Sequence, residues 1–177
     1  MDLRNKFHKQ DLESPPTDAF VCLAAQEKIA IRSVLVRRNL IPSNLGNCPI
    51  CSASSETPSH LLLLCTFAWN IYCDIFTWWN ISWICPSSIT SLIDFWFSNS
   101  FHNLEEICWN TTLYAGLWFI WKARNDLVFN NSIPTVEGVV DLIKLRVAFW
   151  VKGRCNLAIY SIEDFRSHLD GIRKHQI

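Results

Sequence analysis

Three cysteines and one histidine lie close together in the chain, at the spacing Cys48-x2-Cys51-x8-His60-x4-Cys65. Two thiolates with two residues between them can bind one ion from a tight turn, and Pro49 favours such a reversal of the chain. Soft sulfur ligands together with an imidazole suit zinc far better than magnesium or calcium. A Cys3His set fills every position around a tetrahedral ion, which is typical of structural rather than catalytic zinc. The spacing therefore predicts one structural zinc ion, Zn2+, held by these four residues.

The local geometry around the histidine raises a question that the sequence leaves open. Thr57 is a good helix N-cap and Pro58 suits the first helical position, so His60 is expected in the first turn of a helix. Residues five apart on a regular α-helix point about 140° away from each other. His60 and Cys65 therefore cannot both face one ion from a regular helix. Either the first turn is distorted, or the helix begins after His60.

Apolar residues recur at three- and four-residue steps over most of the chain, which predicts a mainly α fold: a small helical domain organised by one Cys3His zinc-binding loop. The 20–40 region is expected to form two short helices broken near Lys28. Further helices are expected over 61–79, 89–97, 104–129 and 136–152.

The same patterns divide the chain into expected regions. Pro15-Pro16 in a polar context predicts a disordered lead-in, whereas the later part of the chain is unusually rich in tryptophan. The expected regions are a lead-in at 1–18, a zinc-binding domain at 19–85, a linker with a short helix at 86–103, a Trp-rich helical region at 104–152 and a tail at 153–177.

Charge and cysteine usage narrow the function classes. The formal net charge is zero, so no global field would attract nucleic acid or an anionic membrane, and any such binding must come from a local patch. Five further cysteines are scattered singly, which does not resemble a disulfide framework. The first ten residues are too polar for a signal peptide. We therefore expect an intracellular protein of the nucleus or cytoplasm, where thiols stay reduced and available for metal.

The segment Leu61–Cys85 is long enough to span a bilayer. However, Asn70, Asp74 and Asn80 interrupt it, and an aspartate at the centre of a membrane helix costs about 3 kcal/mol. We therefore expect no membrane partner, and a membrane-associated protein is the weakest of the hypotheses.

Several segments resemble the reverse-transcriptase zinc-binding domain of plant non-LTR (LINE-type) retrotransposon polyproteins. The matching segments run over roughly Ala19–Trp150 and are IRSVLVRRNL, CPIC, ETPSHLLLLC, the tryptophans near Phe76–Trp79, WFIWKARNDLVF and TVEGVVDLIKLRVAFW. In that family the domain lies between a reverse transcriptase and a ribonuclease H-like region. The resemblance implies that Cys48, Cys51, His60 and Cys65 are the metal ligands and that nucleic acid is a candidate partner.

The chain departs from such a polyprotein in two ways. It contains no Tyr-x-Asp-Asp polymerase motif, and SPPTDAFVCLAAQ stands where the family usually has an entry rich in Trp and Pro-Lys. We therefore expect a fragment of the parent polyprotein that carries neither the reverse-transcriptase nor the ribonuclease H activity, and hence a protein that is not an enzyme.

Two functions remain open from the sequence. The first is a retrotransposon-derived zinc-binding domain that contacts single-stranded RNA or DNA through basic residues near the segment 48–65, here called the metal loop, and farther along the chain. The candidates are Arg32, Arg37, Arg38, Lys122 and Arg124. The alternative is a protein-interaction or structural module whose Trp-rich helices pack against a partner protein. Asp126, Glu137 and Asp141 are the nearest group of carboxylates, and we interpret them as solvated helix faces rather than as a two-metal site.

Overall fold

The computed structural model describes residues 18–99, 101–155, 160–167 and 169–173. Within these ranges the secondary structure is helical, and the one β-type pairing is an isolated antiparallel bridge between Asn47 and Ser55. The mainly α prediction is therefore confirmed. The helices are α2 (Asp18–Ala25), α3 (Arg32–Arg37), η2 (Ser43–Leu45), η3 (His60–Leu64), α4 (Thr66–Trp78), α5 (Ile89–Ser98), α6 (Asn103–Asn130), α7 (Val136–Cys155), α8 (Ile162–Ser167) and α9 (Leu169–Arg173).

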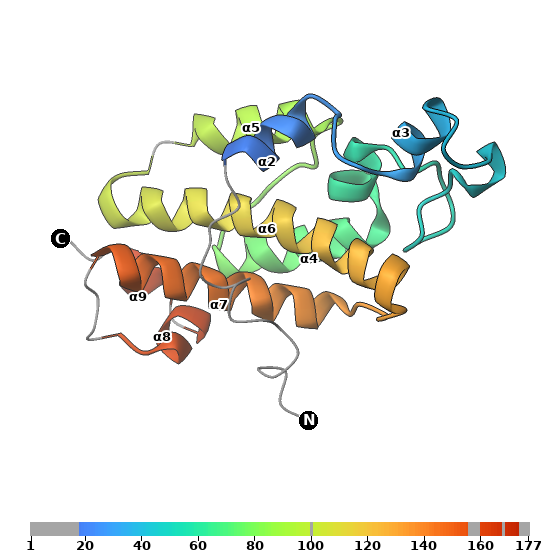
Figure 1. Cartoon of the computed structure of the whole chain (residues 1–177). Coiled ribbons are helices and arrows are strands. Elements are labelled where there is room, and N and C mark those ends of the chain that lie inside the picture. The colour runs from blue at the N-terminus through green and yellow to red at the C-terminus, as the bar shows by residue number, and fades with distance from the viewer. Residues whose placement is uncertain (1–17, 100, 156–159, 168, 174–177) are drawn as a thin grey trace.

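Helix α6 is the centre of the molecule (Figure 1). It carries buried residues from Leu104 to Arg124 along its length, so it is packed on several sides instead of along one stripe. Helices α2 and α5 cover one side, α7 covers another, and η3 contacts it near the metal loop. Helix α8 packs on α7, and α9 packs on α6. Helix α4 also packs on α7.

Several of the described helices end at an asparagine in the left-handed conformation. Asn39 follows α3, Asn80 follows α4 and Asn131 follows α6, with φ of 55°, 53° and 50°. Asparagine tolerates this conformation better than other non-glycine residues, so it stops a helix and turns the chain. Leu40 N–H donates to Leu35 C=O and Ile81 N–H donates to Phe76 C=O, as in a Schellman ending.

Buried tryptophan side chains lie at the centre of the hydrophobic core. Trp79, Trp96 and Trp109 are each at most 1% exposed, and Phe76 lies among them. The indole N–H of Trp79 donates to Thr112 Oγ1 at 3.3 Å, so the one polar atom of this buried ring has a hydrogen-bond partner. The abundance of tryptophan is therefore explained in large part by the core.

Each expected helix has a counterpart among the described ones, whereas α8 and α9 were not expected, because they lie in the region predicted as a tail. The 20–40 region forms two short helices with the break between Ala25 and Arg32, as predicted. The lead-in predicted at 1–18 lies, except for Asp18, outside the described residues, as does part of the tail predicted at 153–177. Among the described residues, no helix combines the length and the apolar character that crossing a membrane requires.

Candidate metal centre

The first two candidate ligands are presented by a tight turn after η2. Ser52 N–H donates to Cys48 C=O at 2.9 Å, and Ser52 has a left-handed φ of 56°. Cys48 N–H in turn donates to Ser54 C=O at 2.8 Å. These bonds reverse the chain, so the side chains of Cys48 and Cys51 come to lie on the same side of the turn.

Thr57 caps the turn that carries the histidine. The backbone N–H of His60 donates to Thr57 Oγ1 at 3.0 Å, and Leu61 N–H donates to Thr57 C=O at 2.8 Å. The N-cap predicted from the sequence is therefore confirmed, with Pro58 at the first helical position.

The turn that follows is a π-helix, and it resolves the question of how His60 and Cys65 can face one ion. Cys65 N–H donates to His60 C=O at 2.7 Å, which closes an i→i+5 turn over His60–Leu64. Such a turn holds one residue more than an α turn, so residues five apart lie near the same side. The first turn is thus distorted, which was one of the two alternatives. At Cys65 the backbone becomes extended, with ψ of 137°, and α4 starts at the next residue.

The wide turn also fits its surroundings. Leu61, Leu62 and Leu63 are all fully buried, whereas Leu64 is 47% exposed. Three consecutive buried side chains need apolar partners on more than one side, and η3 has them because it packs against both α6 and α4. The hydrophobic core therefore holds the His60–Leu64 turn in place.

The four candidate ligands converge on one point. Their ligand atoms, three sulfurs and one imidazole nitrogen, all lie within 4.8 Å of one another. Cys51 Sγ is 3.2 Å from His60 Nε2, so Nε2 is the ring nitrogen that faces the cluster. A tetrahedral zinc ion with Zn–S bonds of about 2.3 Å needs ligand atoms about 3.8 Å apart. The cluster could therefore hold a metal ion after small side-chain movements.

The protonation of the sulfurs is consistent with a cation site. Cys48 and Cys65 are both fully buried. A hydrogen bond to Cys65, together with burial, raises the pKa of the Cys48 thiol, and the same contact lowers the pKa of Cys65. A bound divalent cation would displace the proton of the Cys48 thiol. Three sulfurs and one imidazole nitrogen are as many ligands as a tetrahedral ion takes.

Glu56, in the spacer between the two ligand pairs, joins the metal loop to the rest of the fold. Its carboxylate is fully buried and accepts from Arg124 Nε at 2.7 Å and from Arg124 Nη2 at 2.8 Å. It also accepts from the backbone N–H of Arg32 at 2.7 Å, at the start of α3. Glu56 is not among the site residues predicted from the sequence. The available signal was its position as the one charged residue in the spacer between Cys51 and His60.

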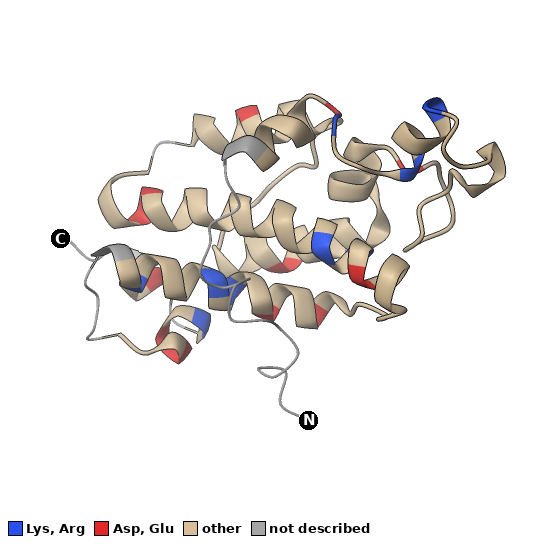
Figure 2. Ribbon diagram, in the orientation of Figure 1, with Lys and Arg blue, Asp and Glu red and all other residues tan. Residues whose placement is uncertain are grey.

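The candidate nucleic-acid-binding residues divide into two groups. Arg37 and Arg38 are exposed on and just after α3, at the end of the molecule that carries the metal loop (Figure 2). Arg32 is half-buried and donates from Nη1 to Asn47 C=O at 2.8 Å, so it braces the loop. Lys122 pairs with Asp126 at 3.6 Å across one helical turn.

Arg124 differs from the role suggested for it by the sequence. Its side chain is 4% exposed, and Nη1 donates to Asn125 Oδ1 at 3.0 Å while the other two nitrogens bind Glu56. A phosphate could reach this guanidinium only if the ion pair broke. We therefore remove Arg124 from the candidate nucleic-acid contacts and assign it to the interior.

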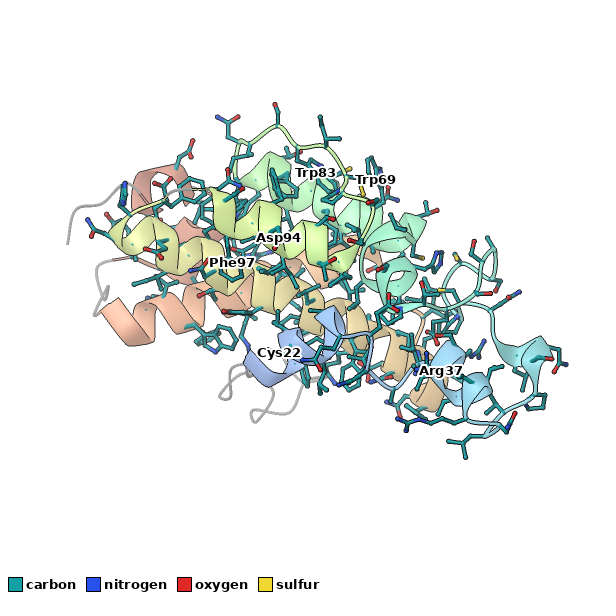
Figure 3. The ribbon with its side chains drawn as sticks, turned by 90° about the horizontal axis from the view of Figure 1, so that it is seen from above. Cys22, Arg37, Trp69, Trp83, Asp94 and Phe97 are labelled. Atoms are coloured by element: carbon teal, nitrogen blue, oxygen red, sulfur yellow. The ribbon has the colours of Figure 1, made fainter. Side chains whose placement is uncertain are left out.

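The exposed Trp69 and the half-buried Trp83 lie away from the exposed Arg37. Trp69 is 41% exposed and its ring centroid is 5.2 Å from that of Trp83. Figure 3 places these two tryptophans and Arg37 at opposite edges of the molecule. A single-stranded nucleic acid bound at α3 would thus lie far from this pair of rings.

The carboxylates considered for two-metal chemistry do not form a shared site. Asp126 pairs with Lys122, and Asp141 pairs with Arg166 at 2.8 Å. Glu137 is exposed. These contacts agree with their interpretation as solvated helix faces.

The comparisons with known proteins agree with the geometry of the metal loop. Residues 3–72 match the family model described as zinc-binding in reverse transcriptase, and this range includes the four converging ligands. No curated protein and no solved structure matches the chain. The matched segment ends within α4, so α5 to α9 lie beyond it. The segment 3–72 of this chain is therefore similar to the zinc-binding domain of reverse transcriptases.

Proposed function

We propose that this chain is a non-catalytic, retrotransposon-derived protein in which Cys48, Cys51, His60 and Cys65 hold one structural zinc ion. The observation that carries the proposal is the convergence of four soft ligand atoms within 4.8 Å. Sulfur and imidazole donors favour zinc over harder cations, and a filled tetrahedral shell favours a structural role. An intracellular, reducing compartment suits such a site because its thiolates stay available for the metal.

Metal analysis of the purified, reduced protein tests this proposal. We expect one zinc per chain in wild type and none in Cys51→Ser or His60→Ala, with local unfolding of the loop in both variants. Cys22→Ser is the matched control, because Cys22 is an exposed cysteine outside the cluster. Substitution by Co2+ adds a second readout, since its absorption spectrum distinguishes tetrahedral sulfur coordination. Wild-type protein that binds no metal when reduced would overturn the proposal.

We further propose that the exposed arginines of the α3 end bind single-stranded RNA or DNA. Arg37 and Arg38 are neighbours at the end of α3, and both are exposed. A zinc ion with three thiolates carries about one net negative charge, which would repel phosphate. Contacts to a nucleic acid are therefore expected at α3 instead of at the ligands themselves.

Binding of labelled single strands at increasing salt tests this second step. The affinity should fall as salt rises, and Arg37→Gln or Arg38→Gln should each lower the slope of log K against log salt by about one. Lys144→Gln is the control, because it removes the same charge from α7, where Lys144 lies over the ring of Trp78 at the end of α4 that is farther along the chain from Cys65. No binding at low salt would instead favour the alternative, a protein-interaction module that uses exposed apolar residues such as Trp69 and Ile84.

A further inference from the structure

We infer that Arg124 and Glu56 are positioning residues of the metal centre, so that the metal affinity of the Cys3His cluster depends on helix α6. This inference rests on the proposed zinc binding. Arg124 lies 68 residues beyond Glu56 and outside the segment that matches the family model. The ion pair between them therefore links two parts of the chain that the sequence presents as separate.

Glu56 is held from several directions. Both carboxylate oxygens accept from Arg124, and Oε2 also accepts from Arg32 N–H at 2.7 Å. The backbone N–H of Glu56 donates to Gly46 C=O at 2.9 Å, and its C=O accepts from Ser33 N–H at 3.3 Å. Position 56 is thus fixed relative to α3, to the chain before Cys48 and to α6.

The position of Glu56 determines where both pairs of candidate ligands lie. The residue before Glu56 is Ser55, which pairs with Asn47 next to Cys48. The residue after it is Thr57, whose hydroxyl caps the turn that presents His60. A displacement of Glu56 would therefore move the cysteine turn and the histidine turn relative to each other.

Arg124 determines where Glu56 can sit. The pair is bidentate, with two parallel N–H···O contacts at 2.7 and 2.8 Å, and this geometry fixes direction as well as distance. Asn125 holds the third nitrogen of the guanidinium. Both partners are almost completely buried, so if either is lost the other remains as an unpaired charge that pulls the loop toward water.

The consequence is a coupling between metal binding and the docking of α6. Without the ion pair, the spacer between the two ligand pairs is no longer held in place. It must then become ordered when the metal binds, and the entropy cost of that ordering lowers the affinity for the metal. Removing partners from the outer shell of a metal site typically weakens binding about 10- to 100-fold. Coupling is reciprocal, so bound metal should also strengthen the attachment of the loop to α6.

The test measures the zinc affinity of the full chain by competition with a chromophoric chelator. Arg124→Met should bind zinc about 10- to 100-fold more weakly than wild type while keeping the tetrahedral Co2+ spectrum. Arg124→Lys should recover part of the loss, because an ammonium keeps the charge but not the bidentate geometry. Glu56→Gln keeps the shape of the side chain and should weaken binding in the same direction.

Two controls separate positioning from general stability. Lys122→Met removes a cation from the same helix, where it pairs with Asp126 at the surface, and should leave the affinity unchanged. Trp96→Phe destabilises the core at a site between α5 and α6, and should also leave the affinity unchanged.

The outcomes of this test are distinct. An affinity of Arg124→Met equal to that of wild type, or an equal loss in Trp96→Phe, would overturn the inference. If Arg124→Met does not fold, Glu56→Gln decides the question by the same comparison. Absence of zinc binding by wild type would count against the proposed function instead.

Discussion

The reciprocal tryptophan pair between α5 and α6 yields a prediction whose size can be worked from the structure. Trp96 Nε1 donates to Trp109 C=O at 3.0 Å, and Trp109 Nε1 donates to Trp96 C=O at 2.8 Å. The rings are stacked with centroids 4.1 Å apart, and both side chains are at most 1% exposed. Trp96→Phe removes one of the two hydrogen bonds and the pyrrole part of one ring.

Two contributions set the expected loss of stability. The missing hydrogen bond contributes about 1 kcal/mol. The missing ring atoms remove about another 1 kcal/mol of apolar burial, and incomplete collapse of the space adds to that. We therefore expect Trp96→Phe to lower the free energy of unfolding by about 2–3 kcal/mol, and Trp109→Phe by a similar amount. Each 1 kcal/mol corresponds to about 2–4 °C in Tm for a chain of this length.

Trp118→Phe is the control for the hydrogen bond, since it removes the same atoms from a half-buried ring whose N–H has no acceptor among the described residues. Trp118 Nε1 itself is buried. Removing that N–H relieves a desolvation cost, so this variant should lose at least about 1 kcal/mol less than Trp96→Phe. Urea unfolding followed by circular dichroism, at a fixed zinc concentration, measures the difference. A loss in Trp118→Phe as large as that in Trp96→Phe would refute the reasoning.

Three further predictions follow from single groups. The hydroxyl of Tyr72 is buried with no partner among the described residues, and burial raises its pKa; Tyr72→Phe should therefore raise the free energy of urea unfolding by about 1 kcal/mol. Because the unfolded chain ionises this group at its usual value of 10, wild type should lose more stability than Tyr72→Phe as pH rises above 10. Zinc uptake should release protons, so calorimetry in buffers of different ionisation enthalpy should detect the release, and the affinity should fall as pH falls. Thr57→Ala should lose about 1 kcal/mol in thermal unfolding because it removes the cap from His60 N–H, whereas Thr57→Ser should retain most of it.

The identity of the candidate ligands could be predicted from spacing, because a Cys-x2-Cys turn followed closely by a His-x4-Cys segment seldom arises by chance. The geometry of the second pair, His60 and Cys65, could not be predicted from the sequence. Whether a chain forms an α or a π turn depends on which carbonyl accepts from Cys65 N–H, and that choice is decided by packing. Here the burial of Leu61, Leu62 and Leu63 between α4 and α6 favours the wider turn.

The helices could also be predicted, since apolar periodicity is a local property. The role of Arg124 could not, because a charged residue near the end of an apolar helix is normally on the surface. Its burial depends on Glu56, which is far away in sequence, and neither residue alone indicates the pair. By contrast, Lys122 has its partner one turn away at Asp126, and such a contact is visible in the sequence itself.

The predicted boundary between the zinc-binding domain and the rest of the chain, at residue 85, separates residues that lie together in the fold. The predicted zinc-binding region contains Glu56 and the three buried leucines of η3, whereas Arg124 and the helix α6 that packs on η3 belong to the Trp-rich region. An isolated loop would expose the leucines and leave the carboxylate of Glu56 without its guanidinium. One hydrophobic core includes residues from both regions. The physical unit that supports the metal cluster is therefore larger than the segment 3–72, and α6 is part of it.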